Sequence, residues 1–381
     1  MAQNNPFLIE GYRSPEYFCD RQEETALLTR HVTNGCNVAL IAQRRIGKSG
    51  LIHNCFHQAD ICKSHYTFYV DIYETKNLGE FVYELGKCVL TTLKPYGRKV
   101  WEKFLDVLTS LKAGVTFDIN GNPEWNISLG DIRKPNAVLD EIFMYLASAD
   151  RPCIVAIDEF QVIATYPEKT VEAALRKRIQ NCHNARFIFS GSKRHMMAEI
   201  FASSARPFYN SSAIMGLEPI DRQKYLAFAN RHLAAIGRHI SDEAFSYLYD
   251  MYDGITWYIQ YVLNILYTMP IQSDNVTADD VKEAIGGIME QQSFVYRTLL
   301  FQLPAKQKQV LRAIASEDKV SGIMSQAFLR RHALTASSVQ SAVKVLLERD
   351  FLTNDDDVYQ LYDRFMQQWL CNRDTENGYK F

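Results

Sequence analysis

The chain has 381 residues, enough for two or three domains, and its 47% hydrophobic and 23% charged residues are ordinary values for a globular protein. A formal net charge of −2 provides no general attraction to nucleic acid or to anionic membranes, so either contact would need a local patch. The eight cysteines include no Cys-x-x-Cys pair and favour neither a disulfide framework nor a zinc site. Because polar residues interrupt the most apolar stretch, from Ile255 to Ile271, and the start lacks signal character, we expect a cytoplasmic protein without a membrane segment.

The first informative segment combines a predicted buried strand, Val38–Ile41, with a polar loop and a helix-compatible run at 50–56. Residues 42–49 depart from the phosphate-binding pattern G-x-x-x-x-G-K-[ST] only at Ala42. Backbone N–H groups at a helix N-terminus bind anions, aided by the helix dipole. We therefore predict that Lys48 reaches the β- and γ-phosphates and that the Ser49 hydroxyl binds Mg²⁺. The remaining predicted phosphate contacts are Gln43, Arg44, Arg45, Ile46, Gly47 and Gly50.

A second apolar strand at 67–72 and an alternating segment at 115–129, which predicts a β-hairpin insert (about 113–130), precede the next motif. Four apolar residues lead there into Asp158 and Glu159. Because ligands bind at the carboxyl edge of parallel strands, we expect both acids at the nucleotide. Asp158 would hold Mg²⁺, and Glu159 would polarise the attacking water as a general base. An exposed acidic turn is the alternative.

Two more predicted strands, 186–190 and 213–215, bring the total to five, separated by helical stretches. This order predicts an α/β fold with a parallel sheet sandwiched by helices. A hydroxyl at the end of strand 186–190 would sense the γ-phosphate or orient water, with Ser190 the first candidate and Ser192 the second. A serine-rich helix cap is an equally open interpretation.

These motifs together resemble the prokaryotic archaeal-type ATPases, AAA+-related P-loop proteins of the broader STAND class. The matching segments are 18–24, 44–49, 70–73, 157–161, 189–192 and 206–209, and the similarity extends across nearly the whole chain. The resemblance implies that ATP, rather than GTP, is the ligand and that Arg21 lies near the adenine. It also makes Arg206 and Arg194 candidates for a charge-stabilising arginine, acting within the chain or on a neighbouring subunit. Gly254-Ile255-Thr256 stands where the lid of this family carries Gly-x-Pro.

After residue 216 the apolar spacing becomes helical, and Thr277-Ala278-Asp279-Asp280 has the form of a capping box with Asp in place of Glu. From Ala305 three helices and a short hairpin predict a winged helix. We therefore predict a P-loop core at 1–216, a helical lid at 217–295 and a winged-helix domain at 296–381.

The predicted winged helix has an unfavourable charge pattern for DNA. Residues 305–372 hold nine basic and eight acidic side chains, and the predicted wing tip, 354–357, reads Asn-Asp-Asp-Asp. Because duplex recognition needs phosphate neutralisation, a contact with a protein partner or with another copy of the chain is favoured over DNA. Arg330, Arg331 and His332 form a small basic cluster that is first interpreted as a solvated helix face, and DNA binding through it is the alternative.

Three functions are compatible with this pattern. The leading hypothesis is a Mg²⁺-dependent ATPase that couples nucleotide state to a conformational switch. The second is a signalling module gated by bound ATP or ADP with negligible turnover. The third is a DNA-associated regulator that uses the winged helix.

Overall fold

The computed structural model describes residues 5–110, 114–128, 132–271, 273–355 and 357–376. The chain forms two compact units. We call Leu8–Tyr225 together with Ile255–Trp257 the sheet unit, and Met1–Phe7, Leu226–Gly254 and Tyr258–Phe381 the helical unit. The predicted domain boundaries at residues 216 and 295 stay predictions.

The sheet unit is built on five parallel strands in the order β2-β5-β6-β1-β7. The strands are β1 (Val38–Ile41), β2 (Tyr66–Asp71), β5 (Cys153–Asp158), β6 (Ala185–Gly191) and β7 (Ala213–Gly216). All five predicted strands are present, each within two residues of its expected bounds. Because the strands are parallel, their carboxyl ends meet at one edge, where the loop after β1 and the two acids at the end of β5 lie.

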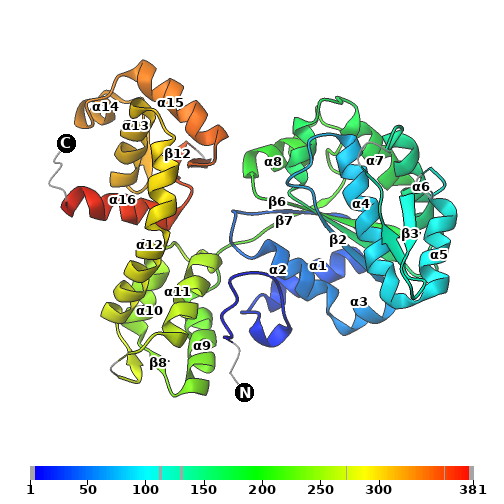
Figure 1. Ribbon diagram of the computed structural model, residues 1–381, viewed down its shortest axis with the longest axis horizontal. Helices are drawn as coiled ribbons and strands as arrows, with labels where there is room; N and C mark the ends of the chain where they lie inside the picture. The colour runs from blue at the N-terminus through cyan, green and yellow to red at the C-terminus, as the bar shows by residue number, and fades with distance from the viewer. Residues whose placement is uncertain (1–4, 111–113, 129–131, 272, 356, 377–381) are drawn as a thin grey trace. The chain divides into compact units, whose positions relative to one another are not determined.

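Alternation along β5 shows why both faces of the sheet are covered. Cys153, Val155 and Ile157 belong to one apolar cluster, and Ile154 and Ala156 belong to the other. A strand that is apolar on both faces must be buried between two helical layers. The helices around the sheet (Figure 1) are α1 (Gln22–Thr33), α2 (Lys48–Phe56), α3 (Ala59–Ser64), α4 (Leu78–Leu93), α5 (Arg98–Val107), α6 (Pro135–Ser148), α7 (Val171–Asn181) and α8 (Arg194–Ala202).

Residues of α1, α2 and α3 supply the cluster on one face, and residues of α4 to α8 supply the larger cluster on the other. Short 3₁₀ helices connect these elements at Pro15–Tyr17, Lys94–Tyr96 and Phe160–Thr165. The predicted fold class is therefore observed.

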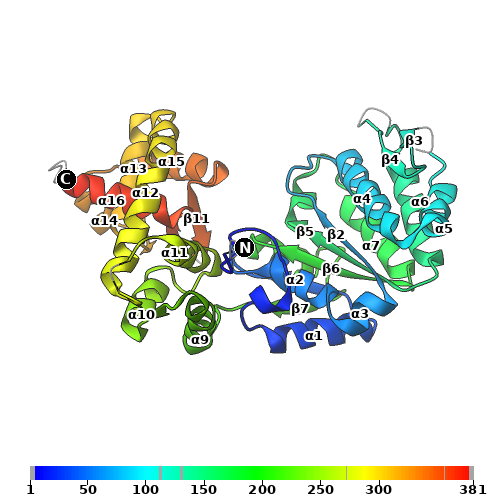
Figure 2. The same cartoon turned by 60° about the horizontal axis from the view of Figure 1, so that its bottom comes forward.

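The predicted hairpin is present as β3 (Val115–Phe117) and β4 (Pro123–Trp125), paired antiparallel beside α4 and α5 (Figure 2). It is anchored by Trp125, whose ring lies so close to Gly86 of α4 that a Cβ there would overlap it. Ile119, expected to continue the alternating face, is fully exposed. Leu129, the last residue of the predicted alternation, lies outside the described residues.

The helical unit begins with a group of helices joined by a two-stranded parallel pair, β8 (His239–Ile240) and β9 (Asn275–Val276). Its helices are α9 (Arg222–Leu233), the 3₁₀ turn Ala234–Ile236, α10 (Asp242–Met251), α11 (Thr256–Thr268) and α12 (Ala278–Phe301), of which α9 and α11 begin in the sheet unit. The expected capping box forms, because Thr277 and Asp280 each accept the other's backbone N–H.

The rest of the helical unit has the predicted winged-helix order. Its elements are α13 (Ala305–Ser316), β10 (Val320–Ser321), α14 (Gln326–Arg331), α15 (Ala336–Glu348), β11 (Leu352–Asp355), β12 (Val358–Leu361) and α16 (Arg364–Glu376). The three strands form an antiparallel sheet in the order β10-β12-β11. Two of the expected wing-tip residues, Asn354 and Asp355, belong to β11, which extends further than predicted.

Candidate functional site

The loop at residues 42–47 joins β1 to α2 at the carboxyl edge of the sheet. It ends at Gly47, the N-cap of α2, whose φ of 103° is one that L side chains rarely adopt. Arg45 also has a positive φ, 67°. With Lys48, Ser49 and Gly50 opening the helix, the first backbone N–H groups of α2 have no intrahelical acceptor and are available to an anion.

Lys48 is 6% exposed, and its ammonium group closes across the loop. Nζ donates to the carbonyl oxygens of Ala42 and Gln43, each at 3.0 Å. Burial lowers the pKa of Lys48, while the charges of Glu159 and Asp158 oppose that shift. The ammonium group thus lies within electrostatic reach of both acids, as expected for three groups that share one ligand.

Asp158 ends β5 and is 5% exposed. The Ser49 hydroxyl donates to its Oδ2 at 2.8 Å, the Tyr69 hydroxyl donates to the same oxygen, and the Glu159 N–H donates to Oδ1 at 3.0 Å. Burial, the largest influence, raises the pKa of Asp158, but the hydroxyls of Tyr69, Ser190 and Ser49 and the charge of Lys48 together hold it below its ordinary value. Asp158 is therefore an ionised carboxylate facing the helix that follows the loop.

Glu159 follows in a left-handed conformation, with φ 55°. Its Oε2 accepts hydrogen bonds from the Ser192 hydroxyl at 2.7 Å and from the side-chain amide of Gln161. The two serine candidates thus have different neighbours. Ser190 is fully buried in β6, and its hydroxyl helps to lower the pKa of Asp158 although the two side chains do not meet the geometric criteria for a hydrogen bond. Ser192 instead donates a hydrogen bond to Glu159.

The candidate arginines occupy other positions. Arg21 is 3% exposed and pairs with Glu24 at 2.7 Å. It also donates to the carbonyl oxygens of Glu218 at 2.6 Å and Ile46 at 3.5 Å. This arrangement makes Arg21 a support beneath the loop, and its predicted place near adenine stays a prediction.

Arg206 forms ion pairs with Glu172 of α7 at 2.7 Å and Glu199 of α8 at 3.5 Å. A role for Arg206 at a nucleotide would require leaving both carboxylates, which the structure pairs within the same unit. The guanidinium of Arg44 lies 5.3 Å from the ring centre of Tyr73. Arg194 begins α8.

The segment Ile255–Trp257 packs on the loop backbone within the sheet unit. Thr256 Oγ1 donates to the Ile46 carbonyl at 3.1 Å, and the Trp257 N–H donates to the Arg45 carbonyl at 3.1 Å. The Arg45 guanidinium lies 4.2 Å from the centre of the Trp257 ring, a cation–π contact. Thr256, where the resembling family has proline, thus supplies a hydroxyl that binds the loop.

The residues fit a nucleotide with a divalent ion. Mg²⁺ prefers hard oxygen ligands and is bound through few protein groups, and the Ser49 hydroxyl with the Asp158 carboxylate provides such a pair 2.8 Å apart. The amides of α2 and the Lys48 ammonium match phosphate oxygens.

Sequence reasoning missed Tyr69, Gln161 and Trp257. Alternation in strand 67–72, which separates Tyr69 from Phe68 and Val70, was the available signal for Tyr69.

Solved structures of other proteins share the fold of this chain. A Walker-type ATPase of Pyrococcus abyssi superposes with a TM-score of 0.63 at 16% identity, covering 96% of this chain and 99% of that one. The ORC2 protein of Aeropyrum pernix in its ADPNP–ADP complexes gives 0.58 at 14% identity, covering 100% and 99%. The chain has the fold of the Walker-type ATPases.

Two further comparisons complete the assignment of this Walker-type fold. The ORC1 protein of Aeropyrum pernix in complex with DNA gives a TM-score of 0.54 at 13% identity and covers 98% of each chain. A protein-family model described as "Probable winged helix domain" matches residues 294–372. No curated protein matches the chain by sequence. The expected AAA+-related fold and C-terminal winged helix are therefore confirmed at the level of architecture.

Within the described ranges, no helix combines the length and the apolar character that crossing a bilayer requires.

Proposed function

We propose that the chain is a Mg²⁺-dependent ATPase whose nucleotide state is transmitted to its winged helix. The observation that carries the proposal is the 2.8 Å hydrogen bond from Ser49, in the helix after the loop, to Asp158, at the end of β5. This bond brings together two motifs that are more than 100 residues apart in sequence, in the arrangement that a phosphate-bound metal ion needs.

The chain's own groups supply the remaining chemistry. Lys48 would exchange the Ala42 and Gln43 carbonyls for phosphate oxygens. Burial lowers the pKa of Lys48, and the negative charge of the phosphates would oppose that shift and favour the ammonium form. Mg²⁺, when bound through Ser49 and Asp158, supplies neutralisation of the phosphate charge.

Glu159 would accept the proton of the attacking water. The water oxygen forms the new bond to the terminal phosphorus as the bond to the leaving ADP oxygen breaks, giving ADP and inorganic phosphate. Ser192 and Gln161 orient Glu159 by hydrogen bonds. The same hydrogen bonds are compatible with the alternative of a nucleotide-gated module, in which Glu159 is held in place but bound ATP is not turned over.

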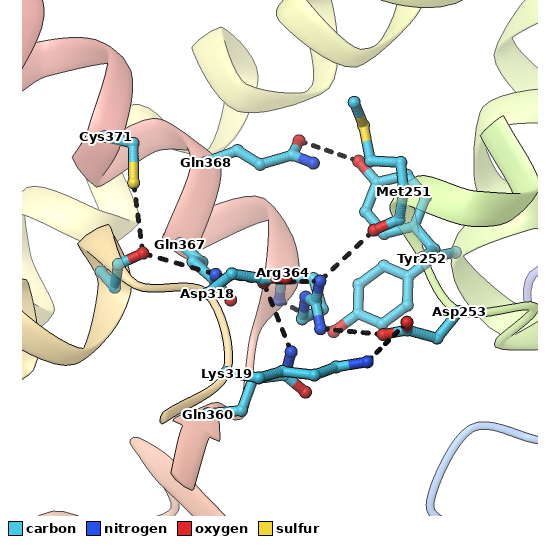
Figure 3. Close-up of polar contacts among 12 residues, drawn as sticks. Met251, Tyr252, Asp253, Asp318, Lys319, Gln360, Arg364, Gln367, Gln368 and Cys371 are labelled. Atoms are coloured by element: carbon cyan, nitrogen blue, oxygen red, sulfur yellow. Dashed lines mark hydrogen bonds and ion pairs between the residues drawn. The ribbon is translucent and has the colours of Figure 1, made fainter. Parts of the chain in front are cut away.

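Contacts at the two ends of residues 253–257 support coupling between the loop at residues 42–47 and the winged helix. Thr256 and Trp257 bind the carbonyl oxygens of Ile46 and Arg45, so a nucleotide that moves the loop would move them. Asp253, three residues earlier, accepts from Arg364 at 3.1 Å and from Lys319 at 2.6 Å inside the helical unit (Figure 3). We infer that loop movement reaches the winged helix along residues 253–257.

A protein partner, or another copy of the chain, is the favoured contact of the winged helix. The basic cluster is partly neutralised, because Glu317 accepts from both Arg331 and His332. The Aeropyrum ORC1 structure is a complex with DNA, and its likeness keeps a DNA-associated role as the second candidate.

The test measures both nucleotide binding and phosphate release with Mg²⁺. We expect Lys48→Ala to lose binding, and Glu159→Gln to retain binding while turnover falls by about 10²–10⁴-fold. Glu23→Gln, at an exposed position of α1, is the matched control and should behave as the parent. Bound ATP that stays intact for hours in the parent would favour the gated module, and equal turnover in Glu159→Gln would remove Glu159 from the mechanism.

A further inference from the structure

Tyr69 and Asp158 lie on the face of the sheet that is covered by α2, the helix that carries Ser49. In the parallel register of β2 and β5, Tyr69 pairs with Ala156 and Asp71 pairs with Asp158. Alternate residues share a face, so Tyr69 follows Ala156 and Asp158, on the side where α2 packs, while Phe68 and Val70 belong to the opposite cluster. The phenol is thereby directed at the carboxylate of a neighbouring strand.

The Tyr69 ring is fixed in this position. Its hydroxyl donates to Asp158 Oδ2, the oxygen that also accepts from Ser49. The imidazole of His53, from α2, packs on the ring with centroids 4.5 Å apart and a 36° tilt. Asp158 therefore has a fixed orientation before any ligand arrives.

We propose that Tyr69 is a positioning residue of the magnesium site, which sets how strongly the divalent ion supports nucleotide binding. The assignment rests on the proposed function. Two donors on Oδ2 and the Glu159 N–H on Oδ1 fix the carboxylate plane. Without the phenol, the Asp158 side chain can rotate more freely, and it adopts the orientation suited to metal binding for a smaller fraction of the time. Hydrogen-bond partners behind metal ligands typically contribute 10–100-fold in metal affinity or activity.

The experiment is Tyr69→Phe, which removes one oxygen and retains the ring against His53. A fluorescent ATP analogue is titrated in EDTA and then with increasing Mg²⁺, and thermal unfolding of the nucleotide-free protein checks the fold. We expect the half-saturating Mg²⁺ concentration to rise about tenfold or more, while affinity in EDTA changes less than about twofold.

Tyr66→Phe is the matched control. Tyr66 lies on the same strand, and its hydroxyl faces Asp150 at 3.5 Å instead of Asp158. The control should leave the Mg²⁺ dependence unchanged.

The possible failures are distinguishable. A parent protein that binds the analogue in neither condition contradicts the proposed function and this assignment together. A parent that shows Mg²⁺-dependent binding, beside a Tyr69→Phe protein with the same Mg²⁺ titration, overturns only the role of Tyr69. Equal weakening in EDTA and in Mg²⁺ would also overturn it, because it would show a general effect on the loop.

Discussion

Gly191, at the end of β6, occupies a position where the site has no room for a side chain. A Cβ built there would overlap the side-chain oxygen of Gln161 and the sulfur of Met197. Gln161 is 2% exposed and donates to Glu159. Because residue 191 has no side chain, Gln161 can occupy the position from which it donates to Glu159.

We predict that Gly191→Ala lowers the turnover number about 10–100-fold, a part of what a general base contributes. The added methyl group displaces Gln161 and, with it, Glu159, while the loop at residues 42–47 keeps its nucleotide affinity. Steady-state phosphate release and equilibrium nucleotide binding measure the two effects separately.

Gly216→Ala provides the control, because a Cβ at the end of β7 meets nothing within 4 Å. Unchanged turnover in Gly191→Ala would show that Gln161 moves aside without affecting Glu159.

At the residue scale, the sequence indicates which side chains can do chemistry, but not how they pair. Lys48, Ser49, Asp158 and Glu159 follow from local patterns whose spacing fixes their geometry. Whether Ser190 or Ser192 contacts Glu159 depends on the left-handed turn at Glu159, which no sequence rule predicts for a glutamate. The ion pairs of Arg206 depend on α7 and α8 packing together, so they too needed the structure.

Among the elements, α13 and α14 are joined by one carboxylate. Glu317, the C-cap residue of α13, accepts hydrogen bonds from Arg331, at the end of α14, and from His332, the next residue. Burial raises the pKa of Glu317, but the bonds from His332 and Arg331 outweigh this and hold it below its ordinary value of 4.5.

The lowered pKa of Glu317 predicts a loss of stability in acid. A carboxyl group that is more acidic when folded stabilises the fold above the unfolded-state pKa, and the contribution is lost as pH falls through the folded-state pKa. We expect thermal unfolding temperatures to fall from about pH 5 downwards, and Glu317→Gln to reduce this slope.

Glu290→Gln, on an exposed position of α12, is the control and should retain the full slope. The same pH dependence in Glu317→Gln and the parent would mean that other carboxyl groups cause the acid sensitivity.

Elements with strong local signals are the ones that the sequence predicts well. The five strands were recognisable because each is a short apolar run bounded by helical stretches. The pair β8–β9 was missed, since two residues per strand give no periodicity to read. The extension of β11 to Asp355 was missed because three consecutive aspartates indicate a turn, whereas pairing with β12 decides the outcome.

On the scale of the whole molecule, Arg364 organises the helical unit (Figure 3). Arg364 is 6% exposed and bonds Asp253 at 3.1 Å, Asp318 at 2.9 Å and the Met251 carbonyl at 3.3 Å. It thereby joins the end of α10 to the turn after α13 and to α16. The helical unit should consequently respond to a displacement of Asp253 as one body.

We predict that Arg364→Met lowers the free energy of unfolding of the helical unit by about 1–3 kcal/mol, because the charged hydrogen bonds that the buried guanidinium makes to Asp253, Asp318 and the Met251 carbonyl are lost. Chemical denaturation followed by hydrogen exchange in α13 and α16 measures the change. The proposed ATP hydrolysis should persist at temperatures where the unit remains folded, since none of the residues proposed to contact phosphate is altered.

Arg297→Met, on an exposed part of α12, tests whether removing any arginine has this effect. An Arg364→Met protein as stable as the Arg297→Met protein would contradict the organising role of Arg364.

The order of strands in the sheet has a consequence for how the chain is made. Strand β1, which leads into the loop at residues 42–47, pairs with β6 and β7 among the residues that the structure describes. Asn37, just before it, accepts from the Phe187 N–H, 150 positions later. During synthesis on the ribosome, the apolar strand β1 therefore has no strand partner until β6 and β7 have emerged. Nascent chains of this kind fold slowly and are exposed to aggregation. Premature termination anywhere before β6 should yield a product that depends on chaperones for solubility.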